Sequence, residues 1–398
     1  MVLRINNRTI TIWTIFLLAF PHLCPLSLQI VWPRIATLFD IGRFASLTVI
    51  LLRLAVKEKT RFNPVVFMIL VMEAWLTLVT YMRGSQTIMR NLISVATAIS
   101  IPLLIYVYSD YMDELLSALY RNYEWLIYAS LLSIALYYPY GMYQTGEIGR
   151  PQYFLGNENG IIFFVIPAVA LALIRIKKEG KKFGPIMLIL ACIANEVVVW
   201  CATGIVGLTV AGALLIYMYT MKRQVNYYVV LSGALIADYL ISVVRILDKF
   251  WITADFIQQA LGKTITLSGR TYIWDAAMPI IYNNLLTGCG RGNHVITDIL
   301  PRHAHNQYFQ VLIVGGLPML ILLLGIMFYL GTVFKREESN TFVNAVMMGM
   351  LACLYIQFIA TARVAMDVWI PLTLASFTPE IAEAVKVRQM EDEDEFLY

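Results

Sequence analysis

The sequence is poor in charged residues, which form 14% of its 398 residues, whereas a soluble domain has about 25%. Apolar residues form 59% of the chain, and the mean hydropathy is +0.70. The formal net charge of +4 is small and gives no support to nucleic acid as a partner. This composition argues against an ordinary soluble domain and predicts a polytopic membrane protein.

Cysteine is also scarce, and its spacing carries no metal motif. The five cysteines form no CxxC pair and no Cys/His cluster of the kind that binds zinc. Most lie inside apolar runs, so we expect them to be packing residues. They are Cys24, Cys192, Cys201, Cys289 and Cys353.

Apolar runs of about 17 to 25 residues fill most of the chain, and each can cross a ~30 Å hydrocarbon core as a helix. Helices are required because backbone polar groups in lipid must be satisfied within their own segment. We therefore predict an all-α, polytopic membrane bundle of about twelve transmembrane helices. The expected spans are 9–31, 35–54, 64–82, 91–109, 123–140, 158–176, 184–200, 202–220, 226–244, 307–333, 341–360 and 364–378.

The first run follows Arg4 and Arg8, as in a signal peptide, but no small-residue cleavage site interrupts it, so we expect a retained span. Basic residues cluster after every second span, which predicts that these loops and both termini are cytoplasmic. The clustered residues are Lys57, Lys59, Arg61, Arg175, Lys177, Lys178, Lys181, Lys182, Lys222, Arg223, Lys335 and Arg336. The acidic run 391–395 then belongs to a disordered cytoplasmic tail, for which partner binding is the less favoured alternative.

This topology divides the chain into four parts. Residues 1–244 hold the first nine spans, 245–306 form a large extracytoplasmic loop, 307–379 hold three more spans, and 380–398 form the acidic tail. The apolar patterns at 256–261 and 272–286 predict amphipathic helices in the loop, lying on the membrane surface as a lid. Gly315, Gly316 and Pro318 predict a kink near the outer end of the tenth span.

The extracytoplasmic face gathers residues that could carry out chemistry. Arginine matches phosphate oxygens bidentately, and histidine can accept a proton near neutral pH. The arginines expected on this face are Arg83, Arg90, Arg150, Arg245, Arg270, Arg291, Arg302 and Arg363. His305, which precedes the tenth span, is the best candidate base, with Glu196 near the outer end of its span as a possible assistant. The whole set suits a pyrophosphate better than any single member does.

Several alternatives remain open for these residues. Each arginine could instead contact lipid headgroups or pair with a nearby aspartate. His303 and His305 could bind zinc, although no third ligand has clear spacing, or could bond to loop carbonyls. Ionisable residues within spans could serve a transporter, but no internal repeat supports one. Among them, Asp40 and Arg43 lie three apart and can neutralise each other.

Three groups of residues resemble a known family. The first is Ser268-Gly-Arg270-x-x-x-Trp274 followed by Gly288-x-Gly290. The second is His305-Asn306-x-Tyr308-x-Gln310 followed by Gly315-Gly-Leu-Pro318, and the third is Arg150 with Phe154, Gly156, Asn157, Asn159 and Gly160. Together, over residues 140–330, they are similar to the O-antigen ligases and the Wzy-type O-antigen or capsule polymerases.

The resemblance implies a GT-C-type glycosyltransferase fold, no cofactor and no metal. It also implies undecaprenyl-pyrophosphate-linked oligosaccharides as donor and acceptor, surrounding membrane lipids and a possible chain-length regulator protein as partners, and the bacterial inner membrane as the location. By resemblance, Arg150, Arg270 and Arg291 would hold the pyrophosphate, and His305 would activate the acceptor hydroxyl. Further substrate contacts are expected from His303, Arg302, Asn306, Glu196 and Arg363. The expected activity is polymerisation of repeat units, with ligation to lipid A-core as the nearest alternative and a lipid-linked sugar flippase as a more distant one.

Overall fold

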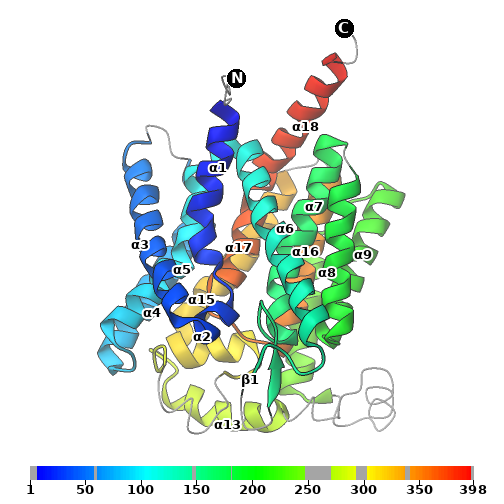
Figure 1. The fold of residues 1–398 in the computed structure, drawn as a ribbon. Helices are drawn as coiled ribbons and strands as arrows, with labels where there is room; N and C mark the ends of the chain where they lie inside the picture. Colours follow the sequence, from blue (N-terminus) through cyan, green and yellow to red (C-terminus); the bar gives the residue numbers. More distant parts are fainter. Residues whose placement is uncertain are drawn as a thin grey trace.

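A computed structural model shows a bundle of long helices with one small hairpin (Figure 1). It describes residues 7–57, 61–145, 149–180, 182–246, 270–292, 303–336 and 341–395. The predicted all-α membrane fold is confirmed. Ser268, Gly269, Arg302 and the amphipathic pattern at 256–261 lie outside the described residues.

The helices follow the apolar runs in order. Their bounds are α1 Asn7–Ala19, α2 Leu26–Val31, α3 Pro33–Ala55, α4 Pro64–Arg83, α5 Ile88–Val107, α6 Met112–Tyr137, α7 Glu158–Glu179, α8 Phe183–Val198, α9 Ala202–Met221, α10 Tyr227–Asp238, α13 Arg270–Asn283, α15 Gln307–Arg336, α16 Thr341–Ala360, α17 Met366–Ser376 and α18 Thr378–Glu395. A π-helical turn, Tyr239–Val243, continues α10.

Seven of the described helices, namely α3, α4, α5, α7, α9, α15 and α16, are long and apolar enough to cross a membrane. The apolar helix α8, and α10 together with its π turn, are shorter. These helices pack side by side with α1, α6 and α17, so that α1 contacts α6, α8 contacts α7, and α9 contacts α16. The most buried of the seven is α16, and together the helices form one continuous apolar core.

The first apolar run is not the single helix that we predicted. It breaks into α1, a 3-10 turn at Phe20–Leu23, and the short helix α2. Pro21 and Pro25 account for the break, because proline removes a backbone donor and clashes with the preceding helical turn. The break places Ser27 against the carbonyl of Phe154, at 2.8 Å.

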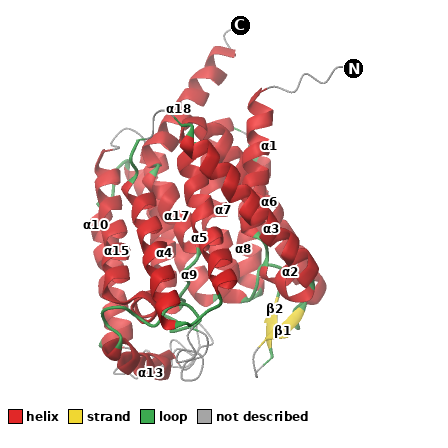
Figure 2. Ribbon diagram, turned by 90° about the vertical axis from the view of Figure 1, so that its left-hand side faces the viewer, coloured by secondary structure: helices red, strands yellow, loops and turns green. Residues whose placement is uncertain are grey.

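The bundle has two chemically different ends (Figure 2). Both termini lie at one end, called here the terminus end, while the hairpin and α13 lie at the other, called the hairpin end. The hairpin pairs β1 (Tyr143–Thr145) with β2 (Arg150–Gln152), antiparallel. No strand was predicted from the sequence.

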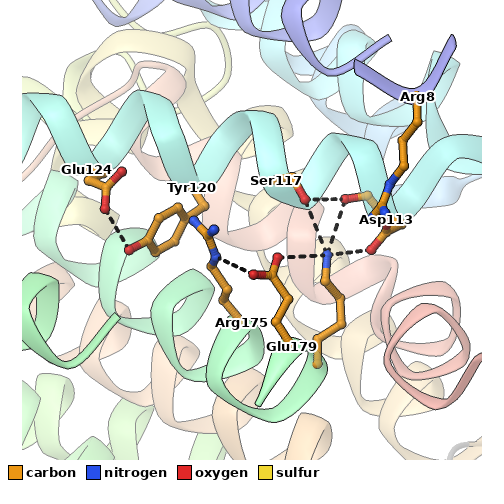
Figure 3. A network of polar contacts seen from close by, with 8 residues as sticks. Arg8, Asp113, Ser117, Tyr120, Glu124, Arg175 and Glu179 are labelled. Atoms are coloured by element: carbon orange, nitrogen blue, oxygen red, sulfur yellow. Dashed lines mark hydrogen bonds and ion pairs between the residues drawn. The ribbon is translucent and has the colours of Figure 1, made fainter. Parts of the chain in front are cut away.

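A network of ion pairs ties helices together at the terminus end (Figure 3). Lys178 is buried and pairs with Asp113 at the start of α6, which also pairs with Arg8 of α1. Nearby, Arg175 pairs with Glu179 at 3.1 Å and lies over the ring of Tyr120. The basic cluster predicted after the sixth span therefore joins three helices.

The acidic tail is helical, so the predicted disorder is wrong for the described residues. α18 begins directly after α17 and runs to Glu395, extending beyond the bundle (Figure 1). Its first turns carry Ile381, Ala382 and Val385, all buried, and this part of the helix contacts α6 and α7. This apolar stripe anchors the helix from which the acidic residues continue.

The predicted kink in α15 is confirmed at Gly316, whose φ of 67° and ψ of −165° interrupt the helix. Such angles are essentially restricted to glycine. The carbonyls released by the kink find new donors: Cys289 donates to Ile313 at 2.7 Å and Gly290 to Val314 at 2.9 Å. Gly288 permits this approach, because a Cβ there would lie 2.6 Å from the backbone of Val314. The glycine pair 288/290 and the kink therefore form one backbone junction.

Candidate active site

His305 lies at the hairpin end, two residues before α15 begins. Its backbone is left-handed, with φ of 51°, which is costly for a residue other than glycine and typical of functional sites. Its ring forms a hydrogen bond with the backbone of Ala360, while its Nδ1 is buried with no hydrogen-bond partner in the described part of the chain. Because a backbone carbonyl can only accept, Nε2 carries the proton, and Nδ1 presents a lone pair.

His303 has a different role from His305. Its Nδ1 accepts a hydrogen bond from the backbone N–H of His305 at 3.2 Å, and the two ring centroids are 4.0 Å apart. The acceptor nitrogen of His303 thus supports the strained backbone of its neighbour. This contact distinguishes the two histidines, which the sequence left equivalent, and favours His305 as the base.

α13 brings Arg270 to this position. Trp274, one turn after Arg270, is buried and donates its indole N–H to the carbonyl of Ala304 at 3.1 Å. The same ring meets Phe309 edge to face, with centroids 6.4 Å apart. Residues four apart share a helix face, so docking of Trp274 directs Arg270 toward the segment that carries His305. The predicted surface helix is confirmed, and its arginine lies at its first residue.

Arg150 reaches the same group of charges from the hairpin. It is exposed on β2, and its charge acts on both Arg270 and His305. Burial lowers the pKa of Arg270 to about 10, and Arg150 adds to this shift while Glu158 opposes it. Arg270 therefore remains a cation at neutral pH. Two arginines from distant parts of the chain act on one histidine.

These charges also determine the protonation of His305. Burial lowers the pKa of His305 to about 2, and the charge of His303 adds to the shift. Arg270 and Arg150 act in the same direction. His305 is therefore neutral across the physiological range, and a bound anion that neutralised the arginines would raise its basicity.

Two glutamates face this group. Glu158, at the first residue of α7, acts on Arg270 and on Glu196. Glu196 is fully buried, and neither of its carboxyl oxygens has a hydrogen-bond partner among the described residues. Its nearest surroundings include Gly204, where a Cβ would lie 2.1 Å from Oε2. Glu196 thus lies deeper in the bundle than the substrate contact expected from the sequence.

Arg363 joins the group through the segment between α16 and α17. Its backbone is fixed by Gln307, which accepts from the Arg363 N–H at 2.8 Å and donates to its carbonyl at 2.9 Å. Its guanidinium pairs with Asp367 and lies over the ring of Phe163. A Cβ on Gly160 would lie 2.7 Å from Nη2 of Arg363, so the glycine leaves room for this cation.

Asn306 is a positioning residue rather than an exposed substrate contact. It is fully buried, donates to Asp238 at 2.6 Å and accepts from the backbone of Phe309 at 3.0 Å. The second contact satisfies a free donor in the first turn of α15. Asp238 lies just before the π turn, a feature often found near functional sites. The contact expected between Asn306 and substrate is therefore not supported.

Arg291 makes its contacts elsewhere at the hairpin end. It pairs with Glu73 of α4, and its backbone is held by Thr80 and Ser85. None of its hydrogen bonds or ion pairs in the described ranges involves Arg150, Arg270 or His305. Arg302 lies outside the described residues. In the described ranges, no group of three or more His, Cys, Asp or Glu residues is placed to hold a metal ion.

The sequence of this region has a known counterpart. Residues 152–324 match the family model described as O-antigen ligase. The chain carries an O-antigen ligase family domain. The match covers Arg270, His303 and His305, whereas Arg150 and Arg363 flank it. No curated protein matches the chain. The protein is thus a membrane enzyme of O-antigen or polysaccharide assembly.

Two site residues of this O-antigen ligase family domain were missed in the sequence. Glu158 lies within the Asn157 to Gly160 motif, and a charged residue between motif positions in a short loop was an available signal. Asp238 was noticed only as an ionisable residue within a span. Its pairing with Asn306 joins positions 68 apart in the sequence, and no spacing rule could reveal it.

Proposed function

We propose that the protein is a polymerase that joins undecaprenyl-pyrophosphate-linked oligosaccharide repeat units. The observation that carries the proposal is the convergence of Arg150 and Arg270 on His305, whose Nδ1 is buried without a partner. Fixed guanidinium groups stabilise negative charge that grows on a departing pyrophosphate. The base and the leaving-group site thus lie side by side.

In the proposed reaction, Arg150 and Arg270 hold the donor pyrophosphate. Nδ1 of His305 accepts the proton of an acceptor sugar hydroxyl, whose oxygen forms a bond to the anomeric carbon as the bond to the pyrophosphate oxygen breaks. A single displacement inverts the anomeric centre. The pyrophosphate also offsets the charges that lower the pKa of His305, so donor binding prepares the base. We propose that no metal takes part.

We further propose that the hairpin end faces outward from the bacterial inner membrane. The basic clusters that follow α3, α7, α9 and α15 belong to the opposite end, together with both termini. Short loops rich in lysine and arginine remain cytoplasmic. This orientation supports a reaction on the extracytoplasmic face.

Ligation of finished chains to lipid A-core is the second candidate, which the description of the matched family favours. Both reactions use the same donor chemistry, so acceptor identity separates them. Purified protein in detergent is supplied with lipid-linked repeat units, with and without lipid A-core. Ladders of longer lipid-linked glycans support polymerisation, and glycosylated lipid A-core supports ligation. Absence of both products across a range of donors would contradict the proposed activity.

A further inference from the structure

A second cavity lies at the hairpin end, away from the His305 group. Its volume is about 440 Å³, within the roughly 300–1,000 Å³ typical of small-molecule sites. Helices α2, α3, α5 and α15 line it, together with residues 291–292 and 362–365. The polar side chains that matter here are Gln29, Arg43, Ser94, Thr97, Arg291 and Gln310.

A short stretch of backbone separates this cavity from the His305 group. Ala362 and Val364 line the cavity, whereas the side chain of Arg363 between them lies over Phe163. Gln310 connects the two regions, because its Oε1 accepts from the backbone N–H of Ala304, the neighbour of His305, at 2.8 Å. The cavity is therefore adjacent to the proposed base and distinct from the arginines around it.

The charges in the cavity are already balanced. Arg43 donates to Asp40 at 2.6 Å, as its spacing in the sequence predicted, and Arg291 pairs with Glu73. Each cation thus has its own carboxylate. A pyrophosphate requires uncompensated positive charge, which Arg150 and Arg270 offer and this cavity does not. An uncharged ligand suits it better.

The free hydrogen-bonding groups indicate the kind of ligand. Nη1 of Arg291 is buried and has no hydrogen-bond partner among the described residues, so one donor remains available. The hydroxyls of Ser94 and Thr97 donate to the carbonyls of Arg90 and Ile93, at 2.9 and 2.8 Å, and keep lone pairs that can accept. Sugar hydroxyls both donate and accept, so they can use both kinds of group.

We propose that this cavity binds an uncharged sugar ring of the acceptor glycan, which presents its reacting hydroxyl to His305 across the segment 303–310. This inference rests on the proposed glycosyl transfer. It assigns the donor pyrophosphate and the acceptor sugar to two sites with different electrostatics, and Arg291 to the acceptor rather than to the pyrophosphate.

The test fills the cavity and measures the two ligands separately. Thr97→Phe adds bulk inside the cavity, and Leu92→Phe adds the same side chain at an exposed position of the same helix. The probes are inorganic pyrophosphate and free neutral oligosaccharide released by mild acid from the surface polysaccharide of the source cells. Binding is measured by calorimetry on full-length protein in detergent, and folding by thermal melting.

We expect Thr97→Phe to weaken oligosaccharide binding at least tenfold and to leave pyrophosphate binding unchanged, while Leu92→Phe changes neither. Ser94→Phe, one turn earlier, should reproduce the loss if Thr97→Phe misfolds. Unchanged oligosaccharide binding in both folded cavity variants, or a loss of pyrophosphate binding instead, would overturn the inference. If oligosaccharide binding depends on the cavity but no transfer occurs with any donor, the acceptor site stands and the proposed activity fails.

Discussion

The indole of Trp274 donates a hydrogen bond to the carbonyl of Ala304 at 3.1 Å, and this contact fixes α13 against the segment that carries His305. Arg270 and Trp274 share one face of α13, so the position of the arginine depends on the docking of the tryptophan. Two segments separated along the chain by residues 284–302 thereby form a single site. The contact also shows how a surface helix can hold a catalytic cation.

Replacing Trp274 with phenylalanine tests this docking. The variant keeps an aromatic ring but loses the N–H donor, at a cost of about 1 kcal/mol. We expect transfer activity to fall severalfold, with the folded protein retained in the membrane, because Arg270 is less well fixed. Trp13→Phe, on an exposed face of α1, is the control. Equal activities of the two variants would show that the indole hydrogen bond does not position Arg270.

Separate alanine variants of the two histidines test which one is the base. His305→Ala should reduce transfer by about 10²- to 10⁴-fold, the usual contribution of a general base. His303→Ala should cause a smaller loss, because its Nδ1 supports only the backbone of His305. Arg270→Ala should abolish chain growth without loss of folded protein. Product ladders from each variant are compared at equal membrane abundance, and a greater loss from His303→Ala would reverse the assignment.

Gly160→Ala tests the space kept for Arg363. The added Cβ would lie 2.7 Å from Nη2 of Arg363 and would displace the end of a flexible side chain. We expect little change in melting temperature and a loss of activity of about tenfold, since displacements near 1 Å can cost up to about 10²-fold. Gly212→Ala is the matched control, because a Cβ there meets nothing within 4 Å. Full activity of Gly160→Ala would remove Arg363 from the site.

Gly316→Ala tests the kink of α15. Its φ of 67° disfavours any residue with a Cβ, and the new atom would lie 2.8 Å from the backbone of Leu285 and Leu286. Because the clash is with backbone, the junction must open. We expect a loss on the order of 1–3 kcal/mol, seen as a lower melting temperature than that of Gly212→Ala. Equal melting temperatures would contradict the proposed junction.

The pH dependence of stability tests the burial of His305. Its folded pKa of about 2 lies below the unfolded value near 6.5, so between these values the unfolded state binds more protons. Stability should therefore fall as pH drops below about 6.5, by up to about 2 kcal/mol at pH 5. Melting curves of unliganded protein at pH 7 and pH 5 should differ less for His305→Gln than for the wild type. Identical shifts would show that His305 is not buried as a neutral ring.

Much of the site could be found in the sequence, because the chemistry of its residues is local. His305, Arg270 and Arg150 were selected as charged or titratable groups in a chain with few of them, and the structure brings them together electrostatically. Arg291 was grouped with them only because it is an arginine on the same face. Its actual partner, Glu73, lies 218 positions away, and no periodicity predicts such a pair.

The sequence by itself determined the membrane fold, the order of the helices and the kink at Gly316. Lipid forces each apolar run to satisfy its own backbone, and glycine and proline act on the chain locally. Only the tertiary structure decided which histidine presents a free nitrogen, which arginines act on it, and that the acidic tail continues a helix. These outcomes depend on contacts between distant segments, such as Ala360 with His305 and Trp274 with Ala304.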